Sequence, residues 1–173
     1  MADLREQSLE DFLDSVGEDT PAPGGGTSSA ITTALAAALV EMAARLAPDE
    51  EAAEAARSMR TEALRLAEEE LTSYAPVLEA ETTADRTTAL DGASEPPAQI
   101  AETAARVAEL GVKVAGSSSP AVRGDALTGV ILAEAAAVAA ARLVETNITS
   151  GPVFDRAREA AGRAAEARQS GVS

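Results

Sequence analysis

The chain has 173 residues and a net charge of −15 at pH 7, and it contains neither cysteine nor histidine. These absences exclude disulfides, thiolate or imidazole catalysis and the usual zinc sites, and we expect no bound metal. The acidic balance excludes nucleic acid as a partner, because phosphate contacts need a basic patch. The length suits one domain spanning residues 1–173, and the 2% aromatic content predicts a core of closely packed helices.

The 29 acidic residues face only 14 basic ones, and Lys113 is the single lysine. So large an acidic excess on a folded domain suggests a protein kept soluble in high salt, and a halophilic source is our hypothesis. The sequence shows no signal peptide, and charged residues interrupt its alanine-rich segments: Glu41, Arg45, Glu134 and Arg142. We therefore expect a cytoplasmic protein without a membrane-spanning segment.

A short helix is predicted before residue 17, capped by Ser8 and expected to lie across the bundle. One of its faces is apolar: Leu9, Phe12, Leu13 and Val16.

Residues 20–26, TPAPGGG, form a segment that we call the collar. Its two prolines exclude a helix before Gly24, and Thr27 or Ser28 is expected to cap the helix that follows. An open helix N-terminus offers about four unpaired amide donors and a partial positive charge, which suits an anion or a developing oxyanion. The glycines fit a simple turn equally well. They match neither a Walker loop nor a dinucleotide-binding fingerprint.

The helix after the collar is predicted to end at Pro48 and to be the central helix of the fold. Its faces as far as Val40 are mostly alanine and threonine, so neighbours can surround it on several sides. Larger side chains form one stripe at helical spacing: Ile31, Leu35, Leu39, Met42 and Leu46.

A long helical segment is predicted from Asp49 to about Ala80, with a kink near its end at Pro76. One of its stripes is apolar except where Glu70 and Tyr74 sit one turn apart. A carboxylate on an apolar face costs free energy unless it is paired. Glu70 is therefore either a solvated residue at the edge of the core or a functional acid.

Residues 81–94 are polar and are predicted to form a loop, with Asp85 as an alternative start of the next helix. Pro96 and Pro97 break or start that helix, whose apolar stripe includes Ile100 and Val114. Residues 116–124 are expected to form a second loop.

Asp125 can cap or begin the last core helix, which is predicted to end between Ser150 and Pro152. Its small residues allow a neighbouring helix to approach closely: Gly129, Ala133, Ala136 and Ala140. Residues 153–168 should form a final amphipathic helix, and residues 169–173 should fray.

These patterns predict an all-helical, up-and-down bundle of about five to six helices. Two helices are apolar nearly all round, which a small monomer cannot satisfy easily, so we expect a homodimer. In such a bundle the collar, Glu70 and Asn147 gather at one end, and Asp125 lies at the other. Only a helix break in residues 81–98 or a second subunit would bring Asp125 to the glycines, and N-capping is an equally good role for it.

Five segments carry a family resemblance over nearly the whole chain: SLEDFLDSV, TPAPGGGTSSA, LAEEELTSYAPVLEA, ASEPPAQIAE and GDALTGVILAEAAAVAAARLVETNI. Together they resemble the cyclodeaminase and methenyltetrahydrofolate cyclohydrolase family, the helical domain also found at the C-terminus of formiminotransferase-cyclodeaminase. The collar followed by a small-residue helix is the most specific of these segments.

The resemblance implies an all-helical homodimer that takes a folate derivative as its substrate and needs no further cofactor. It assigns two kinds of site residue: Gly24, Gly25, Gly26, Tyr74 and Asn147 for substrate binding, and Asp125 and Glu70 for catalysis. The chain departs from the family pattern at Ser118, Ser119 and Leu143, where a glycine-asparagine pair and an asparagine are usual, and near residues 81–86, which look shortened. These departures bear on the choice of substrate.

The reaction we expect first is hydrolysis of 5,10-methenyltetrahydrofolate to the 10-formyl compound. The substrate carries an amidinium cation whose carbon accepts water, so an acidic site attracts it, and Asp125 or Glu70 can take the proton from that water. The collar amides would hold the folate carboxylate or a developing oxyanion.

Two alternatives stay open. The first is cyclisation of 5-formiminotetrahydrofolate with loss of ammonia; the absence of a transferase domain from this chain favours the cyclohydrolase over it. The second is a catalytically silent helical dimer that binds folate or a partner helix.

Overall fold

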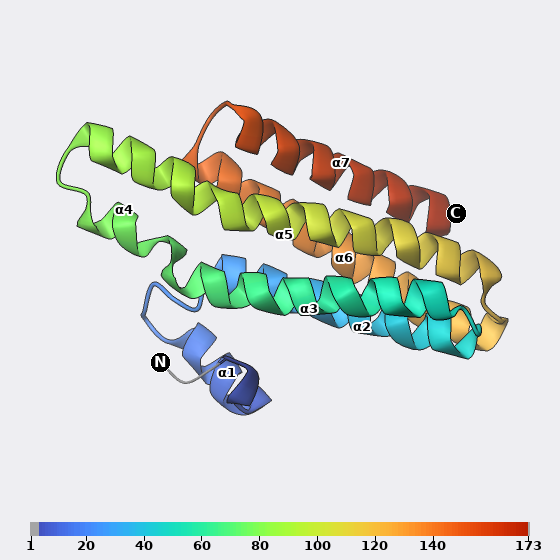
Figure 1. Ribbon diagram of the computed structural model, residues 1–173. Helices are drawn as coiled ribbons and strands as arrows, with labels where there is room; N and C mark the ends of the chain where they lie inside the picture. Colours follow the sequence, from blue (N-terminus) through green and yellow to red (C-terminus); the bar gives the residue numbers. More distant parts are fainter. Residues whose placement is uncertain (1–3, 173) are drawn as a thin grey trace.

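The helices follow one another in an up-and-down bundle in the computed structural model, which describes residues 4–172. Over that range every regular element is helical: η1 (Leu4–Glu6), α1 (Leu9–Gly17), α2 (Gly25–Leu46), α3 (Glu50–Ser73), α4 (Ala75–Glu79), α5 (Thr83–Ser117), α6 (Pro120–Asn147) and α7 (Pro152–Val172). The long helices α2, α3, α5, α6 and α7 alternate in direction along the chain (Figure 1). The predicted all-helical bundle is therefore confirmed.

Helix α2 lies against α3, α5 and α6, as expected for a central helix. Its buried residues are mostly alanines, with Val40 as the largest apolar side chain among them. Gly129 of α6 faces this side of α2, where an added Cβ would lie 3.0 Å from the Ala36 carbonyl oxygen. Small residues thus allow the close helix contacts predicted for the last core helix.

The larger apolar side chains of α2 point outward instead of into the core. Leu35 and Leu46 are 55% and 61% exposed, and Ile131 and Val138 of α6 are 45% and 41% exposed. Both helices bury the sides that contact the rest of the bundle, so their outer sides adjoin on the face behind α3 and α5 in Figure 1. We call this surface the α2–α6 face: Leu35, Met42, Leu46, Ile131 and Val138.

The predicted segment from Asp49 to Ala80 is divided into α3 and α4. The Asp49 carboxylate caps α3 by accepting a hydrogen bond from the Ala52 amide at 3.0 Å. The helix ends at Ser73, and α4 starts at Ala75 with Pro76 in its first turn. The kink expected near Pro76 is therefore a complete helix break.

The loop predicted for residues 81–94 is wrong, because α5 begins at Thr83 and runs through Pro96 and Pro97. Thr82 caps the helix by accepting a hydrogen bond from the Asp85 amide at 3.1 Å, close to the alternative start at Asp85. The Ser94 hydroxyl donates to the Leu90 carbonyl at 2.7 Å, and Pro97 is buried. Packing against neighbouring helices outweighs the local penalty of the prolines.

The loop predicted for residues 116–124 is also wrong. Only Ser118 and Ser119 separate α5 from α6, because Pro120 occupies the first turn of α6, where its missing amide hydrogen costs nothing. Asp125 therefore lies in the second turn of α6 and is not its N-cap.

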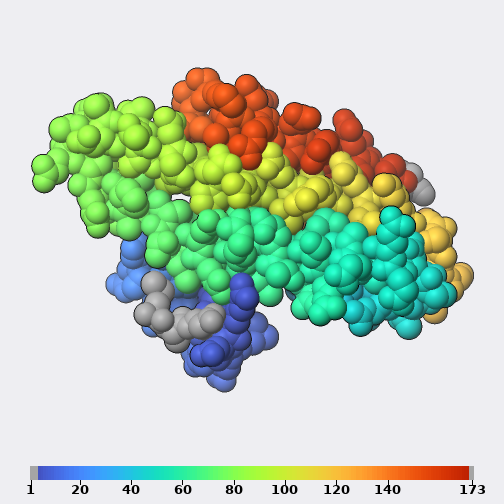
Figure 2. Space-filling view, in the orientation of Figure 1, coloured from blue at the N-terminus to red at the C-terminus, as the bar shows by residue number. Residues whose placement is uncertain are grey.

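Both chain ends are attached to the bundle. Helix α7 extends to Val172, contrary to the predicted fraying, and its Gly171 is buried next to Val112 and Leu127; Ser173 lies outside the described residues. Helix α1 lies at an angle to the long helices and projects from the edge of the bundle at α3, on the side away from α5 (Figures 1 and 2). The preceding turn is tied to α3 by an ion pair of 2.8 Å between Arg5 and Glu68.

Two helices have the length and composition of membrane spans, although charged residues interrupt them. The most apolar windows of α2 and α6 have mean hydropathies of 1.4 and 1.8. These windows are 56% and 44% buried inside the bundle, and a core helix of a soluble protein passes the same test. Composition alone is therefore weak support for a membrane location.

Candidate active site

The collar ends in an open helix N-terminus. Helix α2 begins at Gly25 with Gly24 as its N-cap, so the cap expected at Thr27 or Ser28 is wrong. Gly24 has no side chain with which to accept a capping hydrogen bond, and the Ser28 amide already donates to the Gly24 carbonyl at 3.0 Å. The amides of Gly25, Gly26 and Thr27 consequently have no acceptor within the helix. They form a group of donors at the positive end of the helix dipole.

The carboxyl group of Glu70 lies directly on Gly26. A Cβ added to Gly26 would overlap Glu70 Oε2 and Cδ, so any larger residue here would displace the carboxyl group of Glu70. Among the described residues, Glu70 Oε1 is buried without a hydrogen-bond partner. Burial, together with the negative charge of Glu69, raises the pKa of Glu70 to about 7. Glu70 is thus a half-buried acid, with Oε1 enclosed, that can gain or lose a proton near neutral pH.

A cavity of about 400 Å³ opens beside Glu70 and the collar. This volume lies within the range of small-molecule sites. The lining residues come from the collar, the α3–α4 junction, α5 and α6: Pro21, Ala22, Gly24, Gly25, Gly26, Thr27, Glu70, Leu71, Ser73, Tyr74, Ala75, Leu78, Ala93, Pro97, Leu143, Thr146 and Asn147. Glu70 is the charged residue among them, so the cavity favours a flat, partly apolar ligand that carries positive charge.

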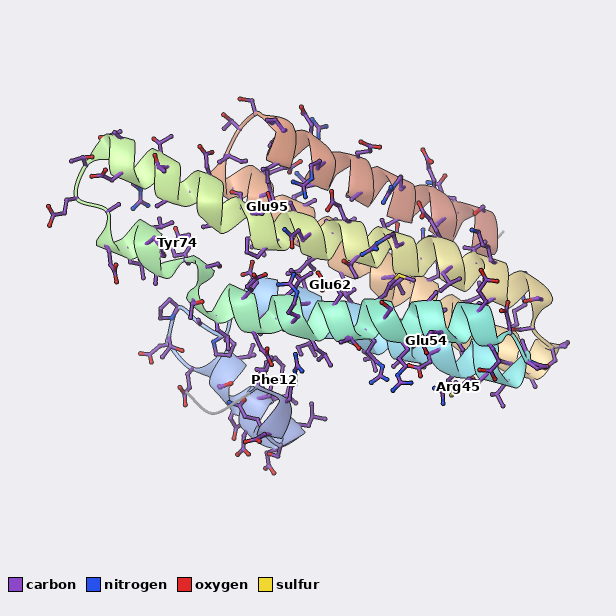
Figure 3. The ribbon with its side chains drawn as sticks, in the orientation of Figure 1. Phe12, Arg45, Glu54, Glu62, Tyr74 and Glu95 are labelled. Carbon is purple, nitrogen blue, oxygen red and sulfur yellow. The ribbon has the colours of Figure 1, made fainter. Side chains whose placement is uncertain are left out.

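The structure brings together six of the seven predicted site residues. The three collar glycines, Glu70, Tyr74 and Asn147 all line the cavity. Tyr74 lies at the junction of α3 and α4, where its side chain is 39% exposed (Figure 3). Asn147 is the last residue of α6 and is half-buried. Their roles toward a substrate stay predictions.

Asp125 does not reach the cavity of its own chain. It is exposed in the second turn of α6, whereas the cavity lies where α6 ends. Helix α5 runs from Thr83 to Ser117 without interruption, so the helix break that would have brought Asp125 to the collar is absent from this segment. The capping role for Asp125 is excluded as well.

Sequence reasoning missed the apolar walls of the cavity. Leu143 lies 3.5 Å from a Cβ built on Gly25, and Pro97 enters the cavity wall from the buried side of α5. Pro97 was read as a helix break, and Leu143 was noted only as a departure from a family pattern. No signal in the sequence separates them from core residues, because apolar residues at helical spacing are typical of both.

Residues 4–172 contain no group of three or more acidic side chains close enough to hold a metal ion.

Over the described residues, the fold and the cavity define an all-helical protein with a half-buried acid beside an open helix N-terminus. The family model described as formiminotransferase-cyclodeaminase matches residues 8–166, so the chain belongs to this family. The predicted family is thereby confirmed. The comparison with curated protein sequences found no significant match.

The fold matches that of a solved structure, formiminotetrahydrofolate cyclodeaminase from Thermotoga maritima, with a TM-score of 0.89. The match covers 96% of this chain and 94% of that chain, at 22% sequence identity. At this identity the likeness establishes the shared fold alone.

Proposed function

We propose that the protein converts 5-formiminotetrahydrofolate to 5,10-methenyltetrahydrofolate and releases ammonia. The observation that carries this proposal is the unpaired carboxyl group of Glu70, buried beside the open amides of α2. Family membership supports a folate substrate and the cyclodeaminase reaction. The solved chain that this chain covers to 94% is itself called a cyclodeaminase, which supports that reaction over the cyclohydrolase.

The reaction requires one proton to move between two nitrogens of the substrate. N10 attacks the carbon of the protonated formimino group and must lose its proton, whereas the departing nitrogen must gain one to leave as ammonia. A group with a pKa near the working pH transfers such a proton most efficiently. Glu70 meets this requirement, because its pKa is raised to about 7.

The remaining residues would bind and orient the folate. The amides of Gly25, Gly26 and Thr27 would donate hydrogen bonds to a carbonyl or carboxylate oxygen of the substrate. Leu71, Pro97 and Leu143 offer apolar surface for the flat pterin ring. The negative charge of an ionised Glu70 would attract the cationic formimino group.

The test measures ammonia release and methenyltetrahydrofolate formation from 5-formiminotetrahydrofolate. Glu70→Gln should lower turnover by about 100-fold or more, as loss of a general acid or base does. Glu54→Gln is the matched control, because Glu54 lies toward the opposite end of α3 with a side chain that is 74% exposed (Figure 3). Turnover that survives in Glu70→Gln would remove Glu70 from the mechanism.

Hydrolysis of 5,10-methenyltetrahydrofolate is the second candidate. The same buried carboxyl group favours it, since ionised Glu70 could take a proton from water that attacks the amidinium carbon. Loss of the methenyl absorbance above the spontaneous rate, without activity on the formimino substrate, would select this reaction. Folate binding without either reaction would identify a catalytically silent member of the family.

We also propose that the protein is a homodimer. The exposed side chains of the α2–α6 face support this, because large apolar groups gathered on one surface commonly mark an interface. Light scattering on the purified protein would give the mass of the particle. A mass of one chain at assay concentrations would contradict the proposal.

A further inference from the structure

Thr27 carries a hydroxyl group without a hydrogen-bond partner at the start of α2. Further along the helix, three hydroxyls each donate to the carbonyl four residues earlier, at 2.7, 2.8 and 2.9 Å: Ser29, Thr32 and Thr33. For Thr27 the carbonyl four residues earlier belongs to Pro23, which precedes the N-cap Gly24 and therefore lies outside the helix. Among the described residues, the Thr27 hydroxyl has no partner.

The Thr27 side chain is almost completely enclosed, and its hydroxyl reaches the cavity. Thr27 is 1% exposed and belongs to the cavity lining. Glu70 Oε1 is one of the described side-chain atoms that are wholly enclosed without a partner, but Thr27 Oγ1 is not. The small exposed part of Thr27 therefore includes its hydroxyl oxygen. Glu70 lies on Gly26, the residue before Thr27, so two oxygens without protein partners lie at one helix start.

The hydroxyl supplies what the neighbouring amides cannot. The open amides of Gly25, Gly26 and Thr27 only donate hydrogen bonds, whereas the protonated formimino group presents N–H donors and needs acceptors. Ionised Glu70 is one acceptor, but in the proposed reaction Glu70 must also protonate the departing nitrogen. A hydroxyl group can accept one hydrogen bond and donate another at the same time.

We propose that Thr27 Oγ1 accepts a hydrogen bond from the cationic formimino nitrogen of the substrate and donates its own hydrogen to the carboxyl group of Glu70. This inference rests on the proposed function and deepens it, because it names a second side chain that orients the reacting group. Thr27 keeps its proton throughout the reaction. Its hydroxyl holds the departing nitrogen next to the carboxyl group that protonates it, which is the geometry that proton transfer requires.

The same contact distinguishes substrate from product. The formimino nitrogen carries N–H groups, and it leaves as ammonia. In 5,10-methenyltetrahydrofolate the bridging carbon carries only a C–H group, so the Thr27 hydroxyl loses this partner when the reaction is complete. Thr27 therefore strengthens the binding of the substrate but contributes little to the binding of the product.

Three variants test the contact by kinetics. Thr27→Val keeps the shape of the side chain and removes the hydroxyl, and kcat/KM for ammonia release should fall by about 10-fold to 100-fold, as expected for one hydrogen bond to a charged group. Thr27→Ser keeps the hydroxyl and should retain most of the activity. Thr33→Val is the matched control, because Thr33 is buried in the same helix outside the cavity lining and its hydroxyl is bonded within the helix.

The inhibition constant of added 5,10-methenyltetrahydrofolate separates a lost contact from a distorted cavity. Thr27→Val should leave this constant nearly unchanged, because the product makes no contact with the hydroxyl. Circular dichroism would verify the fold, and Thr27→Ala replaces Thr27→Val if the valine variant does not fold. Full activity without the hydroxyl, no rescue in Thr27→Ser, or equal weakening of substrate and product would each overturn the proposal.

Calorimetry keeps this inference separate from the proposed function. A wild-type protein that releases no ammonia would reject the proposed function. The formimino and methenyl folates would then be titrated onto the wild type and Thr27→Val without turnover. Selective loss of affinity for the formimino compound in Thr27→Val would still support the contact, and equal affinities in the two proteins would overturn it.

Discussion

Gly26 and Glu70 form a matched pair at the centre of the cavity. The missing side chain of Gly26 gives the Glu70 carboxyl group the space it occupies, and that position raises its pKa. Glycine at this position therefore leaves the space that the neighbouring carboxyl group occupies. Backbone strain is not the reason, because Gly151, and not Gly26, is the described residue with a positive φ.

Gly26→Ala should abolish most of the activity while leaving the protein folded. The new Cβ would occupy the space of Glu70 Oε2 and Cδ, so the carboxyl group must rotate away from the amides of α2. Gly162→Ala is the control, because Gly162 lies in α7 outside the cavity lining and its Cβ would meet nothing within 4 Å. Turnover of both variants decides the prediction, and equal activity in the two would show that the position of Glu70 is unimportant.

Glu70→Gln should stabilise the protein at high pH. The pKa of Glu70 is about 7 in the folded protein against an ordinary 4.5, so its contribution to stability is full below pH 4.5 and falls as pH rises toward 7. At about 1.4 kcal/mol per pKa unit the upper bound of this loss is about 3 kcal/mol, and solvent in the open cavity reduces it.

Urea unfolding at pH 5 and pH 8 would measure the effect. Glutamine carries no charge, so Glu70→Gln should exceed the wild type by about 1 to 3 kcal/mol at pH 8 and by much less at pH 5. Glu54→Gln should change little at either pH. A Glu70→Gln variant less stable than the wild type at pH 8 would mean that the carboxylate is paired in solution.

At the scale of the helices, the sequence predicts type and order better than boundaries or orientation. The stripe from Ile31 to Leu46 established that α2 is a helix, but periodicity does not say which side faces the core when the opposite side is alanine. The alanine side is buried here because α3, α5 and α6 all approach closely. The long start of α5 was missed because Pro96 and Pro97 signal a break locally, and only tertiary packing overrides that signal.

The candidate site shows the same contrast between residues that the sequence identifies and residues that only tertiary packing reveals. Glu70 was identifiable because a carboxylate interrupts an apolar stripe, and the up-and-down order of the helices places it beside the collar and Asn147. Leu143 and Pro97 were not identifiable, since an apolar residue at helical spacing is indistinguishable from core. Asp125 was read as a helix start because residues 116–124 contain glycine, proline and serine, yet Pro120 begins the helix.

Gly111→Ala should destabilise the bundle where α5 packs closely against α2 and α6. A Cβ at Gly111 of α5 would lie 2.7 Å from Val130 Cγ2 and 3.1 Å from Val40 Cγ2, and both are stiff side chains in the core. We expect a loss of about 1 to 3 kcal/mol in the free energy of unfolding. Gly162→Ala in α7 has nothing within 4 Å of the new Cβ and should gain up to about 1 kcal/mol from helix propensity. Denaturant unfolding of the two variants should therefore shift in opposite directions.

At the scale of the molecule, the charge of −15 opposes both folding and association. Ion pairs offset part of it between helices: Arg156 of α7 binds Glu95 and Glu102 of α5 at 3.0 and 2.8 Å. Salt weakens such exposed pairs, but it also screens the repulsion among the excess carboxylates. The chain has about two acidic residues for each basic one. The stability gained by screening the repulsion among carboxylates should therefore exceed the stability lost from weakened ion pairs.

The melting temperature should therefore rise by several degrees when NaCl increases from about 0.01 to about 1 M, as the screening length falls from about 30 to about 3 Å. Sucrose at equal osmolality is the control, because it leaves charges unscreened. A melting temperature that salt does not raise would refute the halophilic hypothesis. Repeating the series at several protein concentrations separates two sources of the gain, since screening within one chain is independent of concentration. Screening between two chains of the same sign strengthens the dimer, so its share of the gain must shrink as the protein is diluted toward dissociation.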